Sequence, residues 1–216
     1  MTTRIIIGDD HPLVRAGLRT ALGSVIENIE VVECPSLDEV LQTLTLRPGE
    51  IDLVLWDLNM PGVRGFAGLF MLLAQHPTLP VAIISAKQDP TTIRRAVAYG
   101  ASGYIPKSLS LPTMAEAVSR ILGGEIWIPP NIGGRGAIAE GDLDLANRFA
   151  RLSGQQMRIL SMIVQGRLNK EIAGELNIAE QTVKGHVSTI FRKLGVGSRT
   201  QAAVLAERLA IVGEEQ

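Results

Sequence analysis

Three aspartates in this sequence stand where a chemical site can form. Asp57 ends an apolar run that begins at Ile51. The pair Asp9 and Asp10 follows a second apolar run, 4–8. Such runs are typical of central parallel strands, and the ligands of open α/β sheets bind at the carboxyl ends of those strands. Because three carboxylates packed together repel one another, we expect a hard cation among them, and Mg²⁺ is the natural candidate.

A hydroxyl and an ammonium group are predicted at the same edge of the sheet. Ser85 ends a fourth apolar run, and Lys107 follows a fifth. Either residue alone is most often a solvated loop residue. Together with the three acids they indicate phosphoryl chemistry. A carboxylate can accept a phosphoryl group when a metal and a cation neutralise its oxygens, and a hydroxyl can then bond the group that has arrived.

Five apolar runs alternate with helical patterns along the first 130 residues, which predicts a parallel sheet with helices on both faces. Pro12 can begin the first helix, and Ser36 can cap the second. Pro106 lacks an amide donor, so the fifth strand is predicted at an edge of the sheet. The predicted strands are 5–8, 29–34, 51–56, 80–85 and 102–105.

The segment 66–74 is apolar nearly all round. If its leucines face the sheet, Phe70 and Met71 point outward. An exposed apolar patch of this kind often marks a contact surface. A helix that is simply more deeply buried would show the same pattern.

Composition and charge favour two small domains in this chain of 216 residues, of which 46% are apolar and 20% charged. The net charge of −1 hides an asymmetry, since residues 1–130 carry about −3 and residues 151–208 about +5. The single Cys34 cannot form an internal disulfide, and no segment is typical of a signal peptide or a membrane span. We therefore expect a cytoplasmic protein that makes no membrane contact and whose second half alone binds nucleic acid.

The periodicity lapses between Pro129 and Asp142, where Gly-rich sequence predicts a flexible linker. A short helix through Phe149 can then lead into a second domain, with Ser153 as the N-cap of its first full helix. The turn between the second and third helices of this domain has the spacing of a helix-turn-helix motif. The four predicted helices are 154–165, 170–176, 180–194 and 200–212.

The predicted helix 180–194 is apolar on one side and carries short or basic side chains on the other. Such a face is usually only solvated, but Glu180 is the single acid on this helix. Gly185 costs about 1 kcal/mol in a helix interior, and close approach to a base edge would explain it. His186 fits a phosphate contact and internal packing equally well. The residues predicted to contact DNA are Lys170, Thr182, Lys184, Gly185, His186, Ser188 and Arg192.

Four motifs of the first part resemble those of the receiver domain of two-component response regulators: GDDHP, DLNMPG, ISA and GYIPK. The resemblance implies a flavodoxin-like fold with a five-stranded parallel sheet, in which a histidine kinase phosphorylates Asp57. Trp56 is bulkier than the residue that this family usually has there, and we expect it in the core under one helix layer.

The same resemblance implies a role for each residue of the site. Lys107 would pair with the phosphoryl oxygens, and Ser85 would bond the phosphoryl group. Tyr104 would be the aromatic switch that turns inward behind Ser85, although its residue type fits plain packing on an edge strand as well. The implied Mg²⁺ ligands are Asp9, Asp10, Asp57 and the backbone carbonyl of Asn59.

The segment 168–202 resembles the four-helix DNA-binding domain of the LuxR/FixJ class, found in the NarL-type response regulators. The motifs NKEIA, TVKGHV and RKLGVGSRTQA carry this resemblance. It implies a homodimer on double-stranded DNA that pairs through the last helix, 200–212. Gln155 and Gln156 stand where the family usually has an Arg-Glu pair, which puts a structural ion pair of the family in question.

Other protein classes fit the acids less well. An aspartyl phosphatase requires an Asp-x-Asp pair after its first strand, whereas Asp9 and Asp10 are adjacent. The acid pair would also repel the flavin phosphate of a flavodoxin. The nearest alternative is a receiver that works through protein interaction without being phosphorylated.

The predicted organisation is an α/β receiver domain at 1–128, a linker at 129–148 and an all-α four-helix, helix-turn-helix domain at 149–216. The predicted function is that of a transcription regulator and not of an enzyme. Phosphorylation of Asp57 by a histidine kinase is expected to alter dimerisation and DNA binding.

Overall fold

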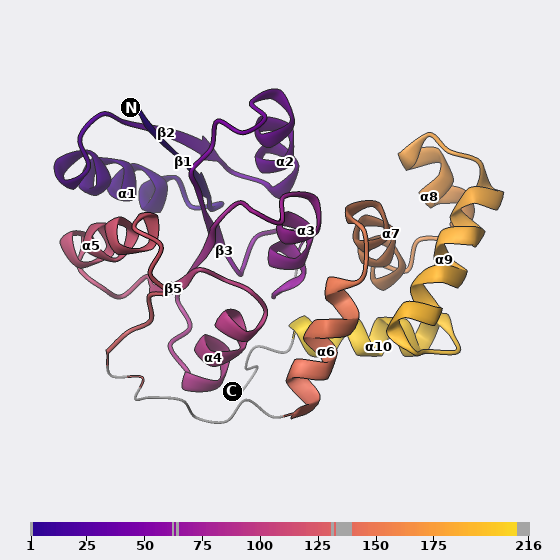
Figure 1. Cartoon of the computed structure of the whole chain (residues 1–216). Helices are drawn as coiled ribbons and strands as arrows, with labels where there is room; N and C mark the ends of the chain where they lie inside the picture. The colour runs from indigo at the N-terminus through magenta and orange to yellow at the C-terminus, as the bar shows by residue number, and fades with distance from the viewer. Residues whose placement is uncertain (1, 62, 64, 131, 133–139, 211–216) are drawn as a thin grey trace.

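The structure is a computed structural model that describes residues 2–61, 63, 65–130, 132 and 140–210. A parallel sheet forms its first part, with the strand order β2-β1-β3-β4-β5 (Figure 1). The fifth strand lies at an edge, as predicted from Pro106, which stands opposite Ser85 in the register. The strands are β1 (Thr3–Gly8), β2 (Ile29–Cys34), β3 (Leu53–Asp57), β4 (Val81–Ser85) and β5 (Gly103–Pro106).

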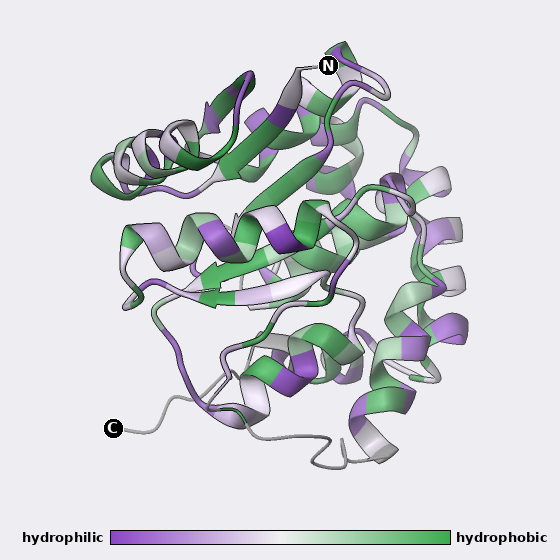
Figure 2. Cartoon of the chain, turned by 60° about the vertical axis from the view of Figure 1, so that its left-hand side comes forward, coloured by the Kyte–Doolittle hydropathy of each residue, from purple (hydrophilic) through white to green (hydrophobic). Residues whose placement is uncertain are grey.

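Helices cover both faces of this sheet. Side chains alternate along β1, so Ile5 and Ile7 lie in one apolar layer and Ile6 lies in the other. The layer of Ile5 and Ile7 is completed by α1 (Pro12–Val25) and α5 (Leu111–Leu122). The layer of Ile6 is completed by α2 (Leu37–Leu46), α3 (Ala67–Gln75) and α4 (Pro90–Ala98). Figure 2 shows largely hydrophobic strands between helices of mixed hydropathy.

Trp56 is fully buried between β3 and α3, which confirms its prediction as a core residue. Its ring occupies the space that side chains would otherwise fill at Gly8 and Gly68. A Cβ atom would lie 2.8 Å from the indole at Gly8 and 2.5 Å from it at Gly68. The glycines therefore allow α3 to pack closely over the residue that precedes Asp57.

The second part is helical, and the predicted helix-turn-helix is confirmed. The turn between α8 and α9 contains Asn177, whose φ of 52° ends α8 in the left-handed conformation. At the start of α7, Ser153 and Gln156 form a capping box. The helices are α6 (Glu140–Ala150), α7 (Gly154–Val164), α8 (Asn169–Leu176), α9 (Glu180–Leu194) and α10 (Arg199–Ala210). Residues 211 and 212, predicted as the end of the last helix, lie outside the described residues.

Helix α6 occupies part of the stretch that was predicted as linker. It begins at Glu140, whereas the sequence indicated only a short helix around Phe149. Two features explain the longer helix. Asp142 is held by an ion pair with Arg95 of α4, and Leu145, Ala146 and Phe149 are buried at helical spacing. Residues 133–139 of the predicted linker lie outside the described residues.

The two parts of the chain pack against each other through α3, which contacts α6, α7 and α10 (Figure 1). Phe70 and Met71 of α3 are only 3% and 4% exposed. The prediction that they form an exposed patch is therefore wrong for this arrangement, because the helical domain covers them. One apolar core continues from the sheet into the helical domain.

Candidate functional site

Asp57 and Asp9 meet at one edge of the sheet because β1 and β3 are neighbours. Gly8 pairs with Trp56 in the register, so the residues that follow these positions lie at the same level. Both aspartates are 1% exposed. The ligand atoms of Asp9, Asp10, His11 and Asp57 all lie within 4.8 Å of one another. The structure thus brings together the three carboxylates singled out in the sequence.

Lys107 lies between two of these carboxylates. Its Nζ is 2.7 Å from Asp57 Oδ2 and 2.7 Å from Asp9 Oδ2. Its backbone N–H donates to the carbonyl of Ser85 at 2.7 Å, which fixes the end of β5 beside β4. The ammonium therefore balances part of the negative charge of the buried acids.

The pKa values of this cluster are perturbed by burial and by pairing. Burial raises the pKa of Asp57, and the hydrogen bond from Lys107 opposes that rise without cancelling it. Burial alone would lower the pKa of Lys107, but its pairing with the Asp57 and Asp9 carboxylates outweighs burial, so the pKa is raised. The pairing of Asp57 with Lys107 therefore limits the rise in the pKa of Asp57 and raises the pKa of Lys107.

The residues fit a divalent metal ion. Asp9 Oδ2 and Asp10 Oδ1 are buried atoms that accept no hydrogen bond of good geometry from the described residues. Their close contacts are an ion pair with Lys107 Nζ and an approach to His11 Nδ1, each at 2.7 Å. Carboxylate oxygens left without hydrogen-bond donors are the ligands that Mg²⁺ takes in proteins.

His11 was not singled out as a site residue in the sequence, although it directly follows the acid pair. Its backbone N–H donates to Asp9 Oδ1 at 2.8 Å, and Nδ1 approaches the carboxylates of both acids. Its place in the GDDHP motif was the available signal. The backbone N–H of Asn59 holds Asp57 Oδ1 in the same manner, at 3.1 Å.

Ser85 and Tyr104 are connected through one short loop. Ser85 ends β4, and its Oγ accepts a hydrogen bond from the Lys87 N–H at 3.2 Å. Tyr104 is fully buried, and its hydroxyl donates to the Lys87 carbonyl at 2.9 Å. Burial raises the pKa of Tyr104 to about 12, against the lowering effect of a hydrogen bond with Ser85. The Tyr104 side chain is therefore already turned inward, and its hydroxyl bonds the loop that follows Ser85.

The outer face of α9 is exposed. Val183, Ile190 and Leu194 face the core, and His186 is half-buried. Lys184 Nζ pairs with Glu180 at 3.0 Å on the surface. A Cβ atom added at Gly185 would meet no other atom of the described residues within 4 Å, so packing there does not require this glycine. The other exposed residues predicted to contact DNA are Lys170, Thr182, Ser188 and Arg192.

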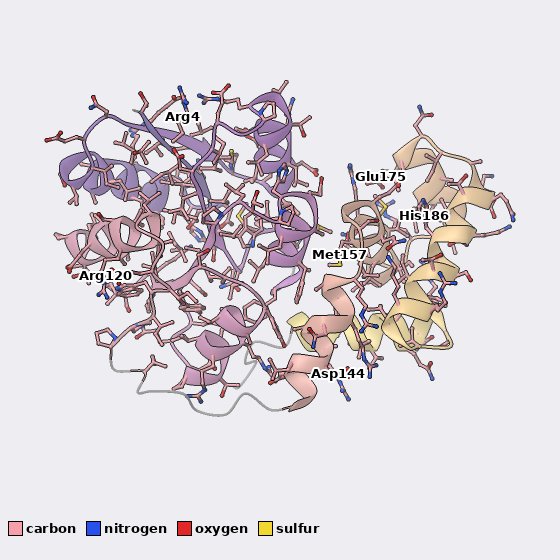
Figure 3. The ribbon with its side chains drawn as sticks, viewed as in Figure 1. Arg4, Arg120, Asp144, Met157, Glu175 and His186 are labelled. Atoms are coloured by element: carbon pink, nitrogen blue, oxygen red, sulfur yellow. The ribbon has the colours of Figure 1, made fainter. Side chains whose placement is uncertain are left out.

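The α9 face lies on the side of the helical domain away from the sheet. Helix α7 contacts both α3 and α9 and lies between them. In Figure 3, His186 marks α9 and Met157 marks α7. Among the described residues, the sheet and its helices therefore leave the predicted recognition face uncovered.

At the start of α7, where the family usually has an Arg-Glu pair, Gln156 contacts the end of α9. Gln156 Oε1 accepts a hydrogen bond from Lys193 Nζ at 2.8 Å, and Lys193 also donates to the Arg151 carbonyl at 2.7 Å. The end of α9 is thus tied to the start of α7 by a neutral amide in place of a carboxylate.

Comparison with known families assigns both parts of the chain. Residues 5–119 match the response regulator receiver domain, and residues 150–206 match the bacterial regulatory proteins of the luxR family. The chain belongs to the response regulators with a LuxR-type DNA-binding domain. It is thus a two-component response regulator that acts as a transcription factor, and the predicted fold class is confirmed.

Two curated relatives span nearly the whole chain. The glycerol metabolism activator of Pseudomonas putida is 40% identical over 209 residues, which cover 94% of each chain. The transcriptional regulatory protein LnrK of Bacillus subtilis is 32% identical over 219 residues, covering 96% of this chain and 98% of LnrK.

Solved structures show the same fold. A LuxR family DNA-binding response regulator from Silicibacter pomeroyi is 33% identical with a TM-score of 0.52, and it covers 60% of this chain and 98% of its own. The response regulator RcsB, solved in a complex with DNA, has a TM-score of 0.56 at 21% sequence identity. The match covers 98% of this chain and 100% of the RcsB chain. Within the described part of the chain, no helix has the length and apolar character needed to cross a membrane.

Proposed function

We propose that Asp57 accepts a phosphoryl group from a histidine kinase, and that the modified receiver alters dimerisation and DNA binding. The observation that carries this proposal is the buried Asp57 carboxylate, paired with Lys107 at 2.7 Å and grouped with Asp9 and Asp10. A buried carboxylate beside a fixed cation is a nucleophile whose product, an acyl phosphate, would be held by the same cation.

The residues of the site divide the chemistry among them. Asp9, Asp10, Asp57 and the backbone carbonyl of Asn59 would hold Mg²⁺, which when bound supplies positive charge next to the incoming phosphoryl oxygens. Lys107 would pair with one of these oxygens. Ser85 accepts from the Lys87 N–H through its oxygen and would donate its O–H to the phosphoryl group in exchange for its bond with Tyr104.

A shift of Ser85 would pass to Tyr104 and then to α4. Tyr104 bonds the carbonyl of Lys87, two residues beyond Ser85. Asp89 caps α4 on the same segment, accepting from the Thr92 N–H at 2.8 Å. The group that bonds the phosphoryl oxygen and the start of α4 therefore belong to one short stretch of chain.

The DNA-binding half supports recognition by α9. Its exposed face would enter a major groove, where Lys184 would reach base edges or phosphates. Lys170 and Arg192 would reach phosphates. One such unit contacts too few base pairs for tight selectivity, so a dimer is expected. RcsB, which has a similar fold, has been solved as dimers bound to DNA.

We further propose that the unphosphorylated receiver acts on the pairing helix and not on the recognition helix. Helix α10 contacts α3, and its apolar residues Ala203, Leu205 and Ala206 are half-buried. The side chains of Leu209 and Val212, which continue this apolar stripe in the sequence, lie outside the described residues. Separation of α10 from α3 would free this face for a second copy of the chain.

A second function is favoured by one observation. Tyr104 is held inward by the protein's own contacts, through its hydrogen bond to the Lys87 carbonyl, and the resemblance assigns that inward position to the activated receiver. A receiver that is controlled by protein interaction, without phosphorylation, would show the same feature. Under either proposal the protein is a cytoplasmic regulator and not an enzyme.

The two proposals are separated by incubating the protein with a small-molecule phosphodonor and Mg²⁺ and measuring its intact mass. Phosphorylation at Asp57 predicts the addition of one phosphoryl group. An unchanged mass for the native chain would remove the first proposal and leave the second.

A further inference from the structure

We propose that helix α6 is a two-sided latch. One side binds the receiver at α3 and α4, and the other holds the carboxyl-terminal end of the recognition helix α9. Release of α6 from the receiver would then be the step that frees the DNA-binding half to pair. The proposal concerns the regulation of the function proposed above and rests on it, but the contacts that define the latch are independent of any chemistry at Asp57.

The receiver side of the latch combines an ion pair with a ring contact. Arg95 Nε of α4 donates to Asp142 Oδ2 at 2.8 Å, and the two side chains are only 27% and 16% exposed. Phe149 packs on Phe70 of α3 with ring centroids 5.7 Å apart. Asp142 and Phe149 share one face of α6, because seven residues make about two helical turns.

The ion pair between Arg95 and Asp142 is sufficiently buried from water to stabilise the position of α6. The bond to Asp142 raises the pKa of Arg95, despite the opposing effect of burial. Exposed ion pairs contribute little because water screens them and long side chains lose freedom. A charge-assisted hydrogen bond between partly buried groups is stronger. The pair also joins residues 47 positions apart, so only a tertiary arrangement can form it.

The other side of α6 is bound to the end of α9. Arg148 Nη1 donates to the Leu194 carbonyl at 3.1 Å, and Arg148 also pairs with Asp144 one turn earlier, at 2.6 Å. The last carbonyls of a helix lack partners within it and carry partial negative charge, so an arginine there is favourable. Figure 3 marks Asp144 on α6.

A line of contacts joins the latch to the acceptor site. Asp89 caps the first turn of α4 on the segment that follows Ser85, and Arg95 lies on the next turns of the same helix. Tyr99 caps the other end of α4 and packs edge-on against Phe66, with centroids 5.0 Å apart. A displacement of α4 that begins at Ser85 would therefore move Arg95 relative to Asp142.

The Tyr99 hydroxyl destabilises the closed arrangement, in which α6 is bound to the receiver. Its ring lies 5.3 Å from that of Phe70, but its hydroxyl is buried and has no hydrogen-bond partner among the described residues. Burial raises its pKa to about 12, and the charge of Asp142 adds to the effect. An unpaired buried hydroxyl opposes the closed arrangement, and exposure to water would relieve this on opening. Removing the hydroxyl should therefore strengthen the closed state.

The test uses five variants of the full-length protein, one of them a control, in the absence of a phosphodonor. Asp142→Asn and Arg95→Asp each break the ion pair, and Arg95→Asp combined with Asp142→Arg restores it in reverse. Tyr99→Phe removes the unpaired hydroxyl. Arg120→Ala is the matched control, since Arg120 pairs with Glu125 at 2.7 Å on the surface of the receiver, within one domain.

Two measurements are made on each variant: hydrogen exchange of the α6 and α3 amides, and affinity for DNA. Each single break should speed exchange in α6 and tighten DNA binding about threefold to tenfold, because the closed state loses a partly buried ion pair. The charge-reversed double variant should return toward the parent protein. Tyr99→Phe should change both readings in the opposite direction, and Arg120→Ala should change neither.

Unchanged exchange and DNA affinity in both Asp142→Asn and Arg95→Asp would overturn the latch. So would a double variant that is no closer to the parent than the single variants, since this would point to damage to the fold and not to a broken pair. Intact mass after phosphodonor treatment is recorded for every variant. Failure of phosphoryl addition would count against the proposed function alone, because the exchange readout needs no phosphoryl group.

Discussion

The edge of the sheet that carries Asp57 and the outer face of α9 are both proposed to function through charged residues, but their charges are balanced in opposite ways. Asp57 and Asp9 are buried, and the protein supplies their counter-charge through Lys107. Lys170 and Arg192 are exposed, and their expected counter-charge is the phosphate of DNA. Changes at the first region should therefore alter chemistry and stability, whereas changes at the second should alter binding in a way that depends on salt.

The largest expected effect is at Asp57. Asp57→Asn should abolish the addition of a phosphoryl group from a phosphodonor and Mg²⁺, because the amide lacks a nucleophilic carboxylate. Intact mass spectrometry measures this directly. Asp52→Asn is the matched control, since Asp52 lies just before the same strand and its Oδ2 accepts from the Arg4 N–H. Phosphoryl addition to Asp57→Asn would show that the acceptor lies elsewhere.

Removal of the internal counter-charge should reduce stability. Lys107→Ala leaves Asp57 and Asp9 buried without their cation, and loss of one partner of a buried pair costs about 3–5 kcal/mol. Denaturant unfolding at pH 7 measures the loss. A loss no larger than that of Arg120→Ala, which breaks an exposed pair, would mean that the buried charges are balanced in another way.

The same variant gives a pH test whose sign follows from the pKa of Asp57. Burial already raises that pKa, and loss of Lys107 removes the main interaction that opposes the rise. A folded-state pKa above the unfolded value gives stability at low pH that is lost as pH increases through it. The deficit of Lys107→Ala should therefore be largest at neutral pH and shrink on acidification. A deficit that grows on acidification would contradict this.

Substitutions in the DNA-binding half should have smaller effects, and the kind of effect should differ between residues. Lys184→Ala should cost about 1–3 kcal/mol on a specific site. Lys170→Ala and Arg192→Ala should weaken binding to all sequences alike and flatten its dependence on salt. Binding titrations on specific and unrelated DNA at several salt concentrations measure both effects. If Lys184→Ala binds every DNA as tightly as the parent, α9 does not present this face to the groove.

The smallest expected effect is spectroscopic. Trp56 directly precedes a proposed metal ligand and is fully buried, so its fluorescence should change when Mg²⁺ binds. Trp127 also emits, so the titration is made in a Trp127→Phe background. A spectrum that stays constant through saturating Mg²⁺ would count against the geometry of the metal site.

Most of the proposed acceptor site could be predicted from the sequence because its residues stand at strand ends. Runs of apolar residues fix where a parallel strand stops, and all parallel strands of a sheet stop at the same edge. Asp57, Ser85 and Lys107 were found in this way. The helices of the DNA-binding domain could also be predicted from the sequence, since their apolar spacing and their caps, such as Ser153, are local signals.

The interface between the two halves could not be predicted in the same way. Phe70 and Met71 were expected to be exposed because the sequence does not show what covers a helix. The ion pair between Arg95 and Asp142 joins distant segments, and no local pattern at Asp142 indicates it. The early start of α6 has the same cause, since tertiary contacts stabilise a stretch whose composition is typical of a linker.

The most direct test of the account is the affinity of the full-length protein for its operator with and without phosphorylation of Asp57. A receiver that holds α10 in one state and releases it in the other should change this affinity by the usual size of an allosteric coupling. We predict that phosphorylation tightens binding about 5-fold to 150-fold, with some binding remaining in its absence because the face of α9 is already exposed. Equal affinities for the phosphorylated and unphosphorylated protein would contradict the switch and favour control without phosphorylation.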